Sequence, residues 1–280
     1  MTRVKVVIAG VNGRMGRAAL AAMANDPRID VVGAFGRKGA HYVGRPLSEL
    51  VSELKSELAP EHKSLADLSI EDSFSSVLKA SPDVVLDFMI AEASIELAQE
   101  CIERGIHPVI GSSGLGEEAV KSLAQKARSK GVGGLIVPNF SLGAVLMMEF
   151  AKQAARYFEN SEVVELHHTK KLDAPSGTAM HTLNKMAAID GAKKFNQRDV
   201  EERELMAGAR GAAHASGLRV HSLRLPGLIS HQEVFFGSGG ELLSVKHDSF
   251  NTSCFNKGMV MAVKAAPKLT ELQIGLETIL

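Results

Sequence analysis

The sequence contains no tryptophan, two tyrosines and two cysteines, and it carries no excess charge of either sign. Two cysteines cannot build the disulfide framework of a small secreted protein. Neither they nor the histidines stand at the C-x-x-C or H-x-x-x-H spacing of a metal site. We therefore expect no metal site. Cys101 and Cys254 suit a reducing compartment, so the expected location is cytoplasmic.

The equal numbers of basic and acidic residues, 32 of each, argue against a general affinity for nucleic acid or anionic membranes. No apolar run reaches the length of a membrane span, and we expect no secretory leader before the first strand. A length of 280 residues is enough for one large domain or two smaller ones. A globular protein with a small-molecule partner is the expectation.

The first thirty residues carry the pattern strand, glycine turn, helix. An apolar run at residues 4–9 is followed by Gly10, Gly13 and Gly16, and an Ala/Leu/Met-rich helix is expected at 17–25. This G-x-x-G-x-x-G spacing is a variant of the dinucleotide fingerprint, in which glycines let the backbone approach a pyrophosphate at a helix N-terminus. The alternative is a glycine turn in some other α/β protein.

The end of the second expected strand, residues 29–35, lacks the acidic residue that usually bonds the ribose of NAD. The sequence there reads Gly36, Arg37, Lys38. Arginine suits the 2′-phosphate of NADP, so we expect NADPH and/or NADH to bind, with NADPH favoured. The alternative is that Arg37 and Lys38 are solvent-exposed loop residues with no role in binding.

Alternating strands and helices up to residue 138 predict a Rossmann-like, doubly wound parallel sheet. A second α+β domain with a mixed, mostly antiparallel sheet is expected after it, and its open face favours oligomerisation. The predicted dinucleotide-binding domain is 1–138, to which a helix in 250–280 returns, and the substrate-binding and oligomerisation domain is 139–249. Further helices are expected at 47–58, 144–160 and 177–190, and second-domain strands at 163–166, 218–223, 232–236 and 241–246.

The segment 165–179 concentrates reactive side chains between an expected strand end and helix start. It holds two adjacent histidines, two adjacent lysines and a Pro-Ser-Gly-Thr turn. Helix N-terminal N–H groups bind anions, and His and Lys add positive charge and transferable protons. The segment therefore predicts a site for a small carboxylate or phosphate with proton transfer. A solvated basic loop with an ordinary helix cap is the alternative.

These motifs together resemble the dihydrodipicolinate reductase family, over essentially the whole chain. The resemblance rests on the glycine turn, on Asp87-Phe88, on the segments 111–114 and 138–141, and above all on Glu165-Leu-His-His and the segment 171–179. It implies a Rossmann-like domain, a mixed-sheet domain that assembles homotetramers, and NAD(P)H-dependent reduction of 4-hydroxy-tetrahydrodipicolinate in lysine and diaminopimelate biosynthesis.

The resemblance also implies roles for single residues. His167 and Lys171 match the proton-transfer residues, and which of them donates the proton stays open. The residues expected to bind substrate are His168, Ser176, Gly177 and Thr178. The residues expected to bind cofactor, together with Arg37 and Lys38, are Gly10, Val11, Asn12, Gly13, Arg14, Met15, Phe88, Gly111, Ser112, Ser113, Val137, Pro138, Asn139 and Phe140.

Four positions depart from the family pattern: Gly36 replaces the acid, Met89 a threonine, Lys170 a frequent histidine and Thr252 an arginine. None of them is an expected proton-transfer or substrate-binding residue. Two other functions stay open. One is a reductase of another cyclic imine or oxo-acid on the same scaffold, and the other is a non-catalytic nucleotide-binding regulator.

Overall fold

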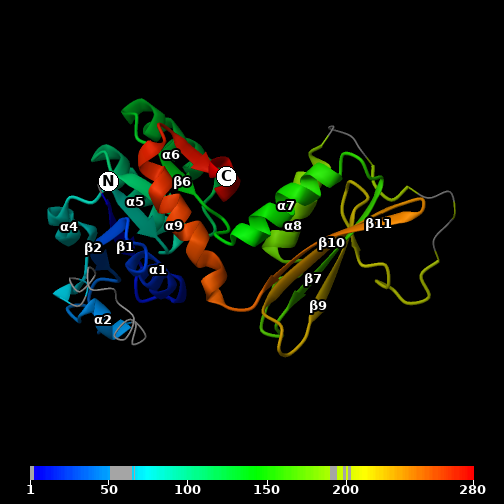
Figure 1. The fold of residues 1–280 in the computed structure, drawn as a ribbon, viewed down its shortest axis with the longest axis horizontal. Helices are drawn as coiled ribbons and strands as arrows, with labels where there is room; N and C mark the ends of the chain where they lie inside the picture. Colours follow the sequence, from blue (N-terminus) through cyan, green and yellow to red (C-terminus); the bar gives the residue numbers. More distant parts are fainter. Residues whose placement is uncertain (1–2, 51–64, 66, 190–193, 198–199, 201–202) are drawn as a thin grey trace. The chain divides into compact units, whose positions relative to one another are not determined.

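The computed structural model describes residues 3–50, 65, 67–189, 194–197, 200 and 203–280. The chain forms two compact units (Figure 1). The first comprises Met1–Leu142 and Phe255–Leu280, and the second comprises Gly143–Cys254. Within the described residues, no helix is both long and apolar enough to cross a membrane.

The first unit is built on a seven-stranded parallel sheet in the order β12-β6-β5-β4-β1-β2-β3. Strand β4 is buried throughout and the last four residues of β1 are buried, as expected for the centre of a parallel sheet covered on both faces by helices. The predicted Rossmann-like sheet is thus confirmed. The strands are β1 (Val4–Ala9), β2 (Ile29–Phe35), β3 (Ile70–Glu71), β4 (Val84–Asp87), β5 (His107–Ile110), β6 (Gly134–Ile136) and β12 (Leu272–Ile274).

The helices of this unit pack in pairs, α1 beside α9 and α5 beside α6. Helix α6 has Glu117 and Glu118 in its first turn, two cations in its last turn, and Gly131 in the left-handed conformation after its end. Each feature stabilises a helix terminus. The helices are α1 (Arg14–Ala24), α2 (Leu47–Leu50), α4 (Phe74–Val77), α5 (Ala91–Glu103), α6 (Glu117–Lys130) and α9 (Asn256–Ala265).

The first unit also differs from its prediction in detail. Strand β12 was not predicted, because three residues are too few to give a periodic signal. It pairs with β6, so the C-terminal segment extends the sheet as well as supplying α9. Of the helix expected at 47–58, residues 47–50 form α2, and the remainder lies outside the described residues.

The second unit holds a five-stranded sheet in the order β11-β10-β7-β9-β8. Strands β7 and β9 are parallel and the other neighbours are antiparallel, so the predicted mixed, mostly antiparallel sheet is confirmed. The strands are β7 (Asn160–His167), β8 (Ala212–Ala213), β9 (Arg219–Arg224), β10 (Ser230–Ser238) and β11 (Glu241–Ser249), and the helices are α7 (Leu142–Ala154) and α8 (Gly177–Ala187).

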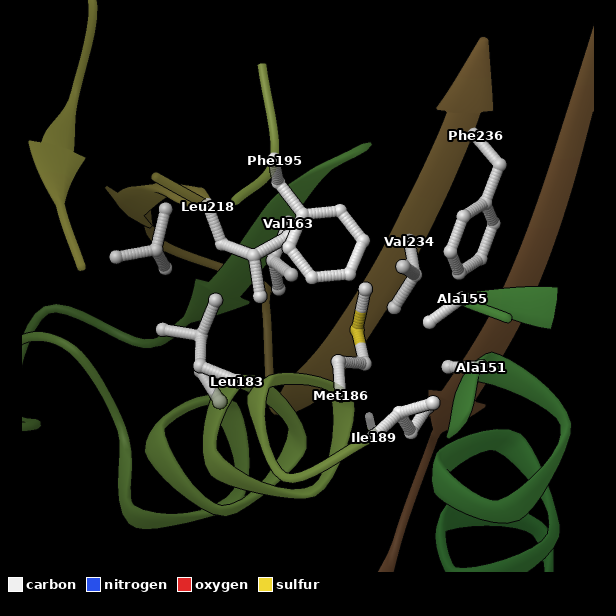
Figure 2. Close-up of a cluster of buried hydrophobic side chains, with 12 residues drawn as sticks. Ala151, Ala155, Val163, Leu183, Met186, Ile189, Phe195, Leu218, Val234 and Phe236 are labelled. Carbon is white, nitrogen blue, oxygen red and sulfur yellow. The ribbon is translucent and has the colours of Figure 1, made fainter. Parts of the chain in front are cut away.

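Helices α7 and α8 cover one face of this sheet and close an apolar core (Figure 2). Helix α7 ends six residues before β7 begins, whereas the sequence pattern predicted helix to residue 160. Asn196 explains the early strand start, because its side chain accepts from Ser161 N and donates to Ser161 O. The core consists of Ala151, Ala155, Val163, Ala179, Leu183, Met186, Ile189, Phe195, Leu218, Val220, Val234 and Phe236.

The opposite sheet face has no helix among the described residues and is hollowed by a cavity of about 790 Å³. Alternation along β7 divides the strand between the two faces, with Val163 in the core and Glu162 and Val164 half-buried on the open face. The open face also presents His221, Leu223, Phe235 and Leu242.

Candidate functional site

The glycine turn after β1 requires glycine at two positions. Gly10 has φ of +72°, and a Cβ there would lie 2.9 Å from Phe88 O. A Cβ on Gly16 would lie 2.3 Å from Gly10 O, so only glycine lets α1 approach the turn this closely. The geometry is that of a loop whose backbone can touch a phosphate.

The N-terminus of α1 is suited to an anion. Its cap residue, Gly13, supplies no side-chain hydrogen bond to the helix, and its first turn contains no acidic residue. Its N–H groups and positive dipole end therefore face no carboxylate of their own first turn. Asn12 is fixed in place by Arg17, which donates to its side chain at 2.6 Å and to its backbone oxygen at 3.1 Å.

A cavity of about 810 Å³ adjoins this turn. Exposed Arg37 and Lys38 line it, which puts two cations beside the glycine turn. The remaining lining residues are Gly10, Asn12, Gly13, Gly36, Gly39, Ala40, His41, Tyr42, Phe88, Met89, Ile90 and Ala93.

Sequence reasoning missed Tyr42. Its hydroxyl accepts a hydrogen bond from Arg37 N at 3.0 Å, and a Cβ on Gly36 would lie 2.5 Å from its ring. Tyr42 therefore fills the space that a side chain at position 36, where the acidic residue was expected, would need. The only signal in the sequence was the rarity of tyrosine, which does not indicate a site.

Residues that follow β4, β5 and β6 pack against one another around two aromatic rings. The ring centroids of Phe88 and Phe140 are 5.6 Å apart, and a Cβ on Gly111 would lie 2.4 Å from one ring and 2.7 Å from the other. The fold thus brings three predicted cofactor residues together. Val11 is fully buried and does not line the cavity; nor do Arg14, Met15, Ser112, Ser113 or residues 137–140.

A buried polar group supports these loops. Ser112 bonds Ser94 at 2.6 Å and Asp87 at 3.4 Å, and Asp87 also accepts from Met89 N at 2.8 Å. Burial raises the pKa of the Asp87 carboxyl, although the hydrogen bonds from Ser94, Met89 and Ser112 oppose that effect. Asp87 therefore links the end of β4 to the loop after β5.

In the second unit, the loop between β7 and α8 carries the histidines and lysines. His167 is the last residue of β7 and is buried, whereas His168 and Lys170 are exposed in the turn. Ser176 caps α8, its Oγ accepting from Ala179 N at 3.2 Å. Gly177 and Thr178 form the first turn of the helix, so their N–H groups lie at its positive end.

His167 lies between a carboxylate and a hydroxyl. Its Nδ1 is 2.5 Å from Glu165 Oε2, and its Nε2 is 3.1 Å from Ser230 Oγ. Burial lowers the pKa of His167. That effect, together with the charges of Lys171 and Arg224, outweighs the opposing hydrogen bond and charge of Glu165. The imidazole is therefore neutral near pH 7.

Glu165 is fully buried and ionised. Arg224 donates to both of its oxygens, at 2.7 and 2.9 Å, and Ser176 N donates at 3.2 Å. Burial opposes ionisation of the carboxyl, but the hydrogen bonds from Arg224, Ser222 and His167 hold its pKa below the usual value. Sequence reasoning gave no role to Glu165 or Arg224, because only the pairing of β7 with β9 brings them together.

The side chain of Lys171 is mostly buried, and its ammonium donates to both oxygens of the exposed Asp173, at 2.7 and 2.9 Å. The hydrogen bond from Lys171 lowers the pKa of Asp173. The loop therefore holds a histidine, a cation and a helix N-terminus, which is a set of groups able to bind a carboxylate and move a proton.

Other histidines of this unit contact carboxylates. His221 bonds Glu162 at 2.7 Å on the open sheet face, and His231 bonds Asp248 at 2.8 Å. In the part of the chain that the structure describes, no group of three or more His, Cys, Asp or Glu residues is arranged to hold a metal ion.

Two family descriptions cover nearly the whole chain. "Dihydrodipicolinate reductase, N-terminus" matches residues 4–140, and "Dihydrodipicolinate reductase, C-terminus" matches residues 143–280.

Curated relatives agree with these matches. The 4-hydroxy-tetrahydrodipicolinate reductase of Bacillus subtilis (strain 168) is 40% identical over 277 residues, covering 99% of this chain and 98% of the relative. That of Streptococcus pneumoniae (strain P1031) is 42% identical, covering 99% of both chains. A solved structure, the dipicolinate-bound dihydrodipicolinate reductase from Paenisporosarcina sp. TG-14, matches with a TM-score of 0.85 and 34% identity over 100% of both chains.

Proposed function

The chain belongs to the dihydrodipicolinate reductase family, and we propose that it reduces 4-hydroxy-tetrahydrodipicolinate to tetrahydrodipicolinate with NAD(P)H in lysine and diaminopimelate biosynthesis. The observation that carries the proposal is the loop between β7 and α8. It combines His167, Lys171 and the N-terminus of α8 in one short segment.

In this proposal the first unit binds the dinucleotide. The fit rests on the two glycines that admit no Cβ, on the α1 N-terminus without a side-chain cap, and on the adjoining cavity. Gly10 to Met15 would hold the pyrophosphate, with Gly10, Asn12 and Gly13 on the cavity wall. The aromatic pair Phe88 and Phe140, with Gly111 to Ser113 and Val137 to Asn139, would form the part of the cofactor site beyond this cavity. NAD(P)H supplies a hydride when bound.

Arg37 and Lys38 are the residues proposed to determine the preference between NADPH and NADH. Both are exposed cations on the wall of the cavity, and among the described residues that line it none is acidic. A 2′-phosphate there would gain charge-assisted hydrogen bonds, whereas a ribose diol would meet no carboxylate. We therefore propose that NADPH is preferred.

The second unit binds the substrate in this proposal. A cyclic dicarboxylate needs cations and N–H donors, and the N–H groups of Gly177 and Thr178, beside the Ser176 cap, with His168 and Lys171, supply them. Loss of the 4-hydroxyl of the substrate as water leaves a conjugated imine. Addition of hydride to that imine moves negative charge toward the ring nitrogen, so an acid must then deliver a proton. His167 and Lys171 are the residues proposed to handle that proton.

The same unit is proposed to assemble a homotetramer through the open face of its sheet. The hollow on that face is lined by apolar side chains that include Val164, Leu223, Phe235 and Leu242. Leu242 is 69% exposed, although it is a large apolar residue. A second copy of the chain is the proposed partner, since exposed apolar patches mark interaction surfaces and most soluble oligomers are built from identical chains. The cytoplasmic location remains a proposal that rests on two free cysteines.

The assay that tests the function follows NADPH oxidation while the synthase that makes the substrate supplies it continuously. Turnover that depends on the synthase, its substrates and this protein supports the proposal. A panel of other cyclic imines and oxo-acids is run in parallel. Faster turnover of a panel member would assign a different substrate, and no oxidation with any of them would favour a regulator.

A further inference from the structure

Glu165 bonds two parts of the loop proposed to act on the substrate, the His167 ring and the cap residue of α8. We infer that this carboxylate, held by Arg224, is a positioning residue that fixes the orientation and tautomer of His167 and ties it to the start of α8. The inference rests on the function proposed for the loop. It concerns residues that would not themselves touch substrate.

The first step concerns the tautomer of His167. An ionised carboxylate can only accept hydrogen bonds, so the Nδ1 atom that lies 2.5 Å from Glu165 Oε2 must carry the proton. The Nε2 atom of the neutral ring then holds the lone pair and faces Ser230 Oγ, 3.1 Å away. Any proton that His167 takes up or gives away therefore moves at Nε2. A carboxylate partner of this kind orients a catalytic histidine in other enzymes.

The second step concerns what holds the carboxylate. Glu165 has no exposed surface, so its charge requires a partner inside the protein. Arg224 provides one through a bidentate contact at 2.7 and 2.9 Å, and the same guanidinium donates to Asp173 O at 2.8 Å. Because a planar guanidinium matches both carboxylate oxygens, this contact restrains the rotation of Glu165 as well as its charge.

The third step links the histidine to the helix. Ser176 N donates to Glu165 Oε1, and Ser176 is the cap residue immediately before Gly177 and Thr178. One buried carboxylate therefore bonds the proposed acid–base residue through Oε2 and the proposed anion-binding helix start through Oε1. The spacing between the proton-transfer group and the substrate carboxylate is set by this shared partner.

The test is Glu165→Gln, read first by ¹⁵N NMR of the histidine side chains, with the His167 signal assigned from its loss in His167→Gln. The matched control is Glu162→Gln. Glu162 lies three positions earlier on the same strand and also bonds an arginine and a histidine, Arg210 and His221. We expect Glu165→Gln to mix the two tautomers of His167, and Glu162→Gln to change the His221 signal and leave that of His167 unaltered.

The second readout is turnover. Glu165→Gln should lower kcat at least about 10-fold, the lower end of what orienting partners contribute, with KM for NADPH changed less than about twofold. An unchanged His167 tautomer, or an unchanged kcat despite mixed tautomers, overturns the inference. If Glu165→Gln fails to fold by circular dichroism, Arg224→Lys is judged by the same criteria, because it keeps the charge and removes the bidentate contact.

The two proposals fail in different ways. If the wild-type protein does not turn over the dipicolinate-type substrate, the proposed function is wrong, and the NMR measurement alone decides whether Glu165 sets the tautomer. If the wild type is active and Glu165→Gln matches it in tautomer and kcat, the function stands and the positioning role is wrong.

Discussion

The ammonium of Lys171 donates to both oxygens of the Asp173 carboxylate, at 2.7 and 2.9 Å. The same ammonium is one of the groups proposed to receive a carboxylate of the substrate. The loop therefore contains an internal anion that engages a cation of the proposed anion site. Because Asp173 is exposed, its side chain can leave when a dicarboxylate arrives.

Replacing Asp173 should therefore change ligand affinity. Asp173→Asn removes the competing charge, so we expect dipicolinate to bind several-fold more tightly, on the scale of one net hydrogen bond. Isothermal titration calorimetry of both proteins with dipicolinate measures the difference. Weaker binding in the variant would mean that Asp173 instead holds the loop in its binding conformation.

The proposed proton-transfer residues should be needed for turnover. His167→Ala and Lys171→Ala should each lower kcat by about 100-fold or more, because general acid–base catalysis contributes on that scale. Steady-state NADPH oxidation measures kcat, and circular dichroism verifies folding. The control is Lys170→Ala, which removes the adjacent exposed lysine and should keep kcat within about threefold. Near-wild-type kcat in both variants would refute the assignment.

Cofactor preference should depend on Arg37 and Lys38. Each charge-assisted contact with a 2′-phosphate contributes about 1.5–3 kcal/mol, so the double alanine variant should raise KM for NADPH at least about 10-fold. KM for NADH should change little. Arg45→Ala, which removes a nearby exposed cation outside the cavity lining, serves as the control. An equal effect on both cofactors contradicts the assignment, as does a wild-type preference for NADH.

The close approach of α1 to the glycine turn should make Gly16 irreplaceable. A Cβ at this position would lie 2.3 Å from Gly10 O and 2.7 Å from Val11 Cα, both backbone atoms that cannot move aside cheaply. Gly16→Ala should cost about 1–3 kcal/mol of unfolding free energy, the usual scale of overpacking. Gly116→Ala is the control, because a Cβ at Gly116 would meet nothing within 4 Å. Equal urea midpoints for Gly16→Ala and Gly116→Ala would show that the turn rearranges to accommodate the Cβ, and would contradict the prediction.

Acid should destabilise the fold through His167. Its pKa is lowered by burial from the ordinary 6.5, so the unfolded chain binds a proton at a pH where the folded chain does not. Stability is therefore lost as pH falls through the ordinary histidine pKa toward the folded value. His167→Gln removes this contribution, while that of His247, whose pKa burial also lowers, remains in both proteins. Urea denaturation at about pH 7.5 and 5.5 should show a smaller loss in the variant; an equal loss contradicts the prediction.

The sequence indicated those parts of the candidate site that lie in one local segment. The glycine turn, the cations after β2 and the β7–α8 loop each stand within about ten residues of a strand end, where periodicity and cap residues are informative. It did not predict Tyr42, whose importance comes from filling the space beside Gly36, or β12, which is stabilised by pairing with β6. Packing partners of this kind carry no local pattern.

The same distinction between local sequence and tertiary packing applies to the loop between β7 and α8. By itself the sequence determined that histidines, lysines and a helix cap lie together, because they are adjacent in the chain. Only the tertiary structure decided that Glu165 faces inward and meets Arg224, 59 positions further along. The parallel pairing of β7 with β9 creates that contact, and a buried charge needs such a partner to be stable.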